Sequence, residues 1–150
     1  MSRGGAPRGE RGTALVEVTW LALLLLVPLL YIVLAVFEVQ RAAFGVSGAA
    51  RAAGRAYAVA PSESVAPGQA TAAAVLALQD QSLDPGRETL GFRCEPDPRN
   101  CLAPGSVITV TVGYSVPLPL LPTALGGQTP SIAVDAVHRV PYGTFREDRP

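Results

Sequence analysis

Few side chains in this sequence could do chemistry, and they stand far apart along the chain. His138 is the single histidine, Cys94 and Cys101 are the only cysteines, and Glu17 is an acid inside an apolar run. No serine, cysteine or acid stands at a spacing that would complete a catalytic unit with His138. Nor does the sequence contain a nucleophile elbow, a phosphate-binding glycine loop or a metal-ligand spacing. We therefore expect no enzymatic activity and no cofactor, with His138 as a partly buried structural residue.

The two cysteines enclose the short segment EPDPRN. A disulfide between Cys94 and Cys101 would contribute about 2.5 kcal/mol in the chain-entropy treatment of a loop of this length. The alternatives are two free thiols or a metal site, and a metal site would need two further ligands in a chain with one histidine. The disulfide is the favoured interpretation, and it requires an oxidising compartment.

Glu17 lies in an apolar segment from Ala14 to Phe37, which has no charged residue from Trp20 onward. A helix of about 24 residues is roughly 36 Å long and can cross a hydrocarbon core of about 30 Å. The segment is too long for a cleavable secretory signal, so we interpret it as a membrane anchor. A carboxylate at the bilayer centre costs on the order of 2.5–3.5 kcal/mol. Glu17 therefore either meets a partner or lies near the interface with its carboxylate at the headgroups.

Residues 11–41, RGTALVEVTWLALLLLVPLLYIVLAVFEVQR, carry a family resemblance. A glycine, a short mixed segment, a glutamate five positions later and an uninterrupted apolar helix together resemble the prepilin-peptidase site of type IV pilin-like proteins. Within that group the stretch is similar to TadE-like minor pseudopilins of the tight-adherence (Flp) pilus system. The resemblance implies cleavage after Gly12 and a free amine on Thr13, which Glu17 of a neighbouring subunit would neutralise. It also implies as partners the membrane, other pilin-like subunits, the pilus assembly platform and a prepilin peptidase.

The chain is expected to have three parts. Residues 1–12 form a basic cytoplasmic leader without regular structure, residues 13–60 a transmembrane and spine helix, and residues 61–150 an extracytoplasmic domain. Arginines flank the apolar segment on both sides, so the positive-inside rule alone does not set the orientation. The leader and the cysteine pair favour a cytoplasmic N-terminus. The 12 basic and 12 acidic residues cancel, which argues against a nucleic-acid partner.

Periodicity predicts an α+β fold for the part outside the membrane. Apolar residues at three- and four-residue spacing continue the first helix to about Ala60. A second helix is predicted over 67–82. The residues expected on its packed face are Ala72, Val75, Leu76, Gln79 and Leu83. Alternation predicts three antiparallel strands at 89–94, 107–116 and 131–140, covered on one face by the second helix and part of the first.

Two further segments lack a predicted element. Residues 117–130 are apolar and rich in proline, and they either fold back on the core, the favoured outcome, or form a contact patch for another subunit or the membrane surface. Residues 141–150 end in charged side chains and are expected to be frayed. The leading interpretation is a minor pilin-like subunit that takes part in assembly of a Tad/Flp-type pilus. The alternatives are a single-pass, signal-anchored extracytoplasmic protein of unrelated function and, ranked lower, a membrane-tethered enzyme using His138.

Overall fold

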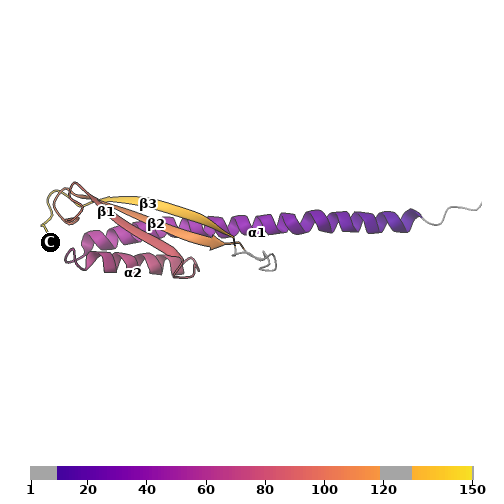
Figure 1. Ribbon diagram of the computed structural model, residues 1–150, viewed down its shortest axis with the longest axis horizontal. Helices are drawn as coiled ribbons and strands as arrows, with labels where there is room; N and C mark the ends of the chain where they lie inside the picture. The colour runs from indigo at the N-terminus through magenta and orange to yellow at the C-terminus, as the bar shows by residue number, and fades with distance from the viewer. Residues whose placement is uncertain (1–9, 119–129, 150) are drawn as a thin grey trace, which may run out of the picture. The chain divides into compact units, whose positions relative to one another are not determined.

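The computed structural model describes the backbone of residues 10–118 and 130–149, with side chains from Ala14 onward. Its elements are α1 (Glu10–Val59), α2 (Ala66–Gln79), β1 (Glu88–Glu95), β2 (Val107–Pro117) and β3 (Ser131–Pro141) (Figure 1). The predicted α+β class is therefore confirmed, with a long N-terminal helix, a second helix and three strands. A boundary between two compact units falls within α1, between Val36 and Phe37. The division into leader, spine helix and extracytoplasmic domain stays a prediction.

Helix α1 begins earlier than the sequence predicted. It starts at Glu10, so the last residues of the leader are helical, whereas residues 1–9 lie outside the described part of the chain. The helix-forming residues that follow explain this start, because adding a residue to an existing helix is far cheaper than nucleating one. Pro28 is inside α1. It has no N–H to donate to the carbonyl of Leu24, four residues earlier.

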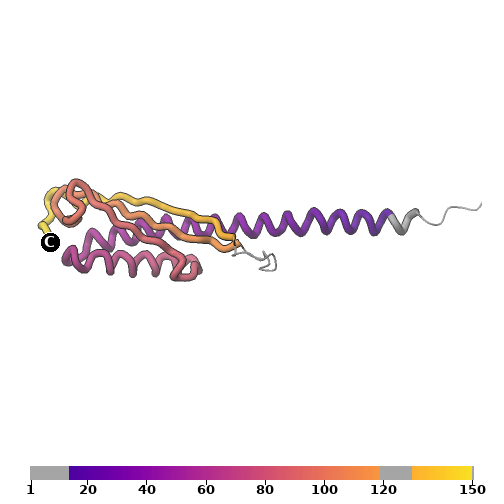
Figure 2. Tube along the Cα trace, viewed as in Figure 1, coloured from indigo at the N-terminus to yellow at the C-terminus, as the bar shows by residue number. Residues whose placement is uncertain are grey.

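The sheet is an antiparallel meander in the order β1-β2-β3, as the trace in Figure 2 shows. Its register places Cys94 opposite Ile108 and Val110 opposite His138. Alternation along β2 matches the prediction, and its buried side chains are Ile108, Val110, Val112, Tyr114 and Val116. The same face of β3 is only half-buried. One face of the sheet thus meets a core to which both helices contribute.

Helix α1 approaches the sheet closely at Gly54. A Cβ on this residue would lie 2.6 Å from Cγ2 of Val140 and 3.3 Å from Cδ2 of His138. Distances this short leave no room for a side chain, so glycine sets how near the helix and the sheet can lie. One turn further on, the ring of Tyr57 packs against Phe92 with their centroids 5.3 Å apart.

The packed face of α2 differs from the prediction. Its buried residues recur every four positions and are Ala66, Ala70, Ala74 and Leu78. Leu76, expected inside, is 62% exposed, and Ala72 and Gln79 are also exposed, whereas Leu83 is buried beyond the end of the helix. An alanine row brings the helix backbone close to its neighbours, which larger side chains would prevent. The helix also ends at Gln79 rather than Ser82, which has a positive φ of 55°.

Candidate functional site

The apolar part of α1 is uncovered within the described structure. The large apolar side chains from Leu15 to Phe37 are 42–73% exposed. By length and composition this helix can cross a membrane, and it is the one such helix among the described residues. Exposure of so many large apolar side chains is unfavourable in water, whereas lipid would remove the cost. The helix therefore indicates single-pass membrane anchoring.

Glu17 stands among these exposed apolar residues. It shares one face of the helix with Trp20, Leu21 and Leu24, and these four line a common hollow along α1. Within the described side chains Glu17 has no cationic partner. The backbones of Gly12 and Thr13 are helical, while their side chains lie outside the described part. Whether Gly12 is cut, and what Glu17 pairs with, stay predictions.

The cysteines predicted to pair lie at bonding distance. Cys94 is the penultimate residue of β1 and Cys101 is in the following loop, with their Cα atoms 5.2 Å apart. Both are buried, at 2% and 4% exposure, and both are in the disulfide, so neither offers a free thiol. The bond closes the loop that precedes β2.

Beside this loop lies a residue that sequence reasoning missed. Glu63, in the linker between the helices, accepts three hydrogen bonds through its carboxylate. Tyr57 Oη donates to Oε1 at 2.5 Å, and the backbone N–H groups of Cys101 and Leu102 donate to Oε2 at 3.2 Å each. Burial, the hydrogen bond to Glu63 and the negative charge of Glu63 raise the pKa of Tyr57 well above its ordinary value. Glu63 thus joins the end of α1 to the disulfide loop.

Residues 141–149 of the segment expected to be frayed are held by hydrogen bonds, and for them that prediction is wrong. Tyr142 is fully buried, and its N–H donates to the carbonyl of Ser106 at 2.7 Å. Arg146 donates to the carbonyl of Ala58 at 2.7 Å, and Arg149 to that of Ala60 at 3.1 Å. The last turn of α1 has no basic residue of its own. The two arginines supply donors to carbonyls that a helix end leaves without intrahelical partners, and their charge suits the negative end of the helix dipole.

His138 is half-buried on the inner face of β3, near Gly54, as the alternation predicted. Among the described residues, no hydrogen bond joins its ring to an acid, a serine or a cysteine. No three metal-ligating side chains converge anywhere in the described ranges. Among the described residues, His138 lies beside Gly54 and opposite Val110.

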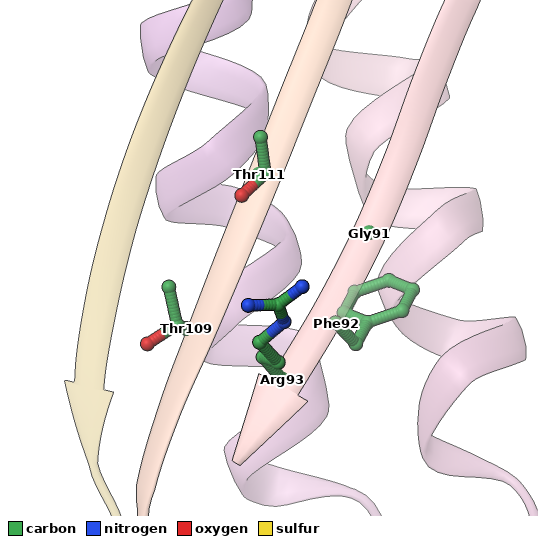
Figure 3. Close-up of a pocket in the computed structure, with 5 residues that line it drawn as sticks. All are labelled: Gly91, Phe92, Arg93, Thr109 and Thr111. Carbon is green, nitrogen blue, oxygen red and sulfur yellow. The ribbon is translucent and has the colours of Figure 1, made fainter. Parts of the chain in front are cut away.

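A shallow hollow of about 500 Å³ lies on the outer face of the sheet, between β1 and β2. Figure 3 shows Arg93 lying near Thr109 and Thr111, beside the space left by Gly91, while the ring of Phe92 points away. One guanidinium and two hydroxyls can donate hydrogen bonds, but none of these lining residues is an acid, a histidine or a thiol. The hollow can hold a polar group, and no base stands beside the two hydroxyls among its lining residues.

Comparison of the chain with protein-family models, with curated protein sequences and with solved structures finds no match. The functional argument therefore rests on the residues of this chain.

Proposed function

We propose that this protein is a TadE-like minor pseudopilin, anchored in the membrane by α1, that takes part in assembly of a Tad/Flp-type pilus. One observation carries the proposal. Glu17 is the one acid within the apolar segment from Ala14 to Phe37, where it is exposed near the start of that uncovered segment, and the helix continues without interruption to Val59. A carboxylate inside an apolar segment is costly unless it meets a partner or reaches the headgroups.

Removal of the leader would create a cationic partner for Glu17. Cutting after Gly12 frees the amine of Thr13, which stands four residues before Glu17. When subunits pack side by side, the carboxylate of one can neutralise the ammonium of the next. Pairing offsets the cost of holding both charges in an apolar environment, and a lone charge there would be strongly unfavourable. The pair would therefore favour assembled subunits over isolated ones.

The disulfide supports the direction in which the chain is inserted. Cys94 and Cys101 lie at bonding distance in the unit that begins at Phe37. Because disulfides persist in oxidising compartments, this unit belongs outside the cytoplasm and the leader inside. A prepilin peptidase, the assembly platform and other pilin-like subunits are the partners that this arrangement requires.

The test is the N-terminal sequence of the mature protein from native membranes. We expect the chain to begin at Thr13, and G12V to abolish processing while the control G9V leaves it intact. E17Q should be processed normally but should fail to support pilus assembly, whereas E38Q, which removes a carboxylate nearer the other end of the apolar segment, should assemble. If the protein keeps its leader and still functions, the proposal is wrong. The alternative of a signal-anchored extracytoplasmic protein of unrelated function then remains.

A further inference from the structure

Two arginines face solvent on the outer face of the sheet, on either side of a threonine. The strand register places Arg93 of β1, Thr109 of β2 and Arg139 of β3 side by side. Neighbouring strands are about 4.8 Å apart, so the backbones of the two arginines are about 10 Å apart across Thr109. Both arginines are exposed, and neither belongs to an ion pair among the described side chains.

The next row of the sheet leaves a space beside these groups. It consists of Gly91, Thr111 and Val137, again one residue from each strand. Gly91 has no side chain, and the shallow hollow of about 500 Å³ opens at this point, with Arg93 lying near Thr109 and Thr111 (Figure 3). Because Arg139 is exposed on the other side of Thr109, rotation of its side chain can bring a second guanidinium to the same place.

Acids on the same face of the sheet lie outside this pair of rows. Glu95 is one row beyond Arg93, opposite Val107, and Asp135 is opposite Gly113, two rows away from Arg139. Between these two acids, the outer face holds two positive charges and no negative one. The hollow is therefore a place where an anion is favoured.

The donors identify the kind of anion. Two guanidinium forks can each point two N–H groups at a ligand, and the hydroxyls of Thr109 and Thr111 add two more donors. A carboxylate accepts about four hydrogen bonds on two oxygens. A phosphate monoester has three terminal oxygens, and its charge of about −1.5 to −2 at pH 7 matches two arginines. Phosphate therefore satisfies more of the available donors than a carboxylate does.

We propose that Arg93, Thr109 and Arg139 bind the phosphate group of a soluble phosphate monoester on the outer face of the sheet. A hollow of about 500 Å³ is larger than a phosphate group and falls in the range of small-molecule sites, so it also has room for the group that carries the phosphate. Binding of this kind is a further activity, separate from the proposed role in pilus assembly, because none of these residues lies in α1.

The position of the hollow along the molecule favours a soluble ligand over a lipid headgroup. Val110 and His138, the chain neighbours of Thr109 and Arg139, lie against Gly54 of α1 on the inner side of the sheet. About 25 Å of helix separates Gly54 from Phe37, where the apolar segment ends. Headgroups of the membrane that holds α1 are therefore far from the two arginines.

The test is titration calorimetry of the full chain in dodecyl maltoside micelles, with glucose 6-phosphate as the probe. R139M removes one guanidinium from the site, and its matched control R51M removes an exposed arginine from α1. We expect R139M to weaken binding by about ten- to hundredfold, the effect of losing a hydrogen bond to a charged group. R51M should leave the affinity unchanged.

A second variant tests the hollow without changing any charge. A Cβ on Gly91 would lie 4.0 Å from Cβ of Thr111, an ordinary contact, and valine is favoured in strands, so G91V should fold normally. Its side chain projects into the hollow and should weaken binding at least tenfold. A thermal unfolding midpoint equal to that of the wild type would show that the loss is not a loss of folding.

The nature of the ligand is tested with two comparisons. Gluconate, which carries a carboxylate in place of the phosphate, should bind at least tenfold more weakly than glucose 6-phosphate. In nanodiscs at 0.15 M salt, where charges more than about 8 Å apart are largely screened, replacing phosphatidylcholine by phosphatidylglycerol should leave the affinity for glucose 6-phosphate unchanged. A loss of affinity would mean that headgroups occupy the site.

Several outcomes would overturn the assignment of a phosphate site. They are the absence of measurable binding by the wild type, equal effects of R139M and R51M, and wild-type affinity in G91V, since the last two indicate general attraction between charges. Equal affinities for gluconate and glucose 6-phosphate would remove phosphate as the ligand class, and competition by phosphatidylglycerol would remove the soluble source.

Discussion

Replacing Glu63 by alanine tests whether the carboxylate joins α1 to the disulfide loop. The substitution leaves three donors without an acceptor, and they belong to residues that are 2% (Tyr57), 4% (Cys101) and 0% (Leu102) exposed. A buried donor left unpaired costs about 1–3 kcal/mol. Glu63 itself is only half-buried, and alanine opens room for water, so the lower end of this range applies to each donor. We expect E63A to reduce the free energy of unfolding by about 3 kcal/mol.

The assay is unfolding of the full chain in detergent micelles, followed by near-ultraviolet circular dichroism of the tyrosines. At about 4 °C per kcal/mol for a unit of this size, the loss lowers the midpoint of thermal unfolding by about 12 °C. The matched control is D135A, which removes an exposed acid from the outer face of β3 and should change the free energy by less than about 0.5 kcal/mol. Hydrogen exchange should show faster exchange of the amides of residues 101 and 102 in E63A alone.

Two outcomes would refute this reasoning. If E63A and D135A have the same midpoint, the three hydrogen bonds contribute nothing that water does not replace. The amide oxygen of glutamine can still accept from the backbone N–H groups, so E63Q should retain part of the stability. If E63Q is as unstable as E63A, the hydrogen bonds to these N–H groups are not what stabilises the fold.

Three further predictions concern other contacts in the unit that begins at Phe37. G54A should lower the free energy of unfolding by about 1–3 kcal/mol, because its methyl group would overlap the sheet. G48A, with nothing within 4 Å of the added Cβ, should be neutral or stabilising by up to about 1 kcal/mol. Urea unfolding of the two variants measures the difference. The raised pKa of Tyr57 means that above pH 10 the unfolded chain loses a proton that the folded chain keeps. The free energy of unfolding should therefore fall by up to about 1.4 kcal/mol per pH unit above pH 10 because of this group. Unfolding measured on both sides of pH 10 should show this slope in the wild type and not in Y57F. Reduction of the Cys94–Cys101 bond should lower the free energy of unfolding by about 2.5 kcal/mol, and thermal scans with and without reductant measure the difference.

Regular patterns in the sequence were enough to predict the class of fold and the strands. Alternation over 107–116 identified both the strand and its buried face, because a sheet covered on one side alternates strictly. The uninterrupted apolar run similarly located the membrane-competent part of α1. The face of α2 could not be read in the same way. Alanines and other small or apolar residues occur on several of its faces, so the pattern did not single out the face with Ala66, Ala70 and Ala74 that is buried.

The contacts around Glu63 and Arg146 had no local signature. Glu63 meets Cys101 and Leu102, 38 and 39 residues away, and Arg146 meets Ala58 across 88 residues. Hydrogen bonds of this kind join single polar groups to backbone atoms. Any acid or arginine in a loop could form one, so the sequence does not indicate which residue does. The sequence predicted the cysteine pair, which the structure places at bonding distance, whereas the side chains that tie the disulfide loop to α1 emerged only with the tertiary structure. The role of Glu17 stays a prediction.

The bonds from Arg146 and Arg149 to the end of α1 have a consequence for biosynthesis. The carbonyls of Ala58 and Ala60 receive these donors only after almost ninety further residues have been made. The apolar part of α1 leaves the ribosome much earlier and can enter the bilayer while the rest of the unit is still incomplete. Long-range contacts of this kind also slow folding, because the chain must close a large loop before they form. We therefore expect insertion to precede folding, with the unit that begins at Phe37 closing only once residues 142–149 have reached it.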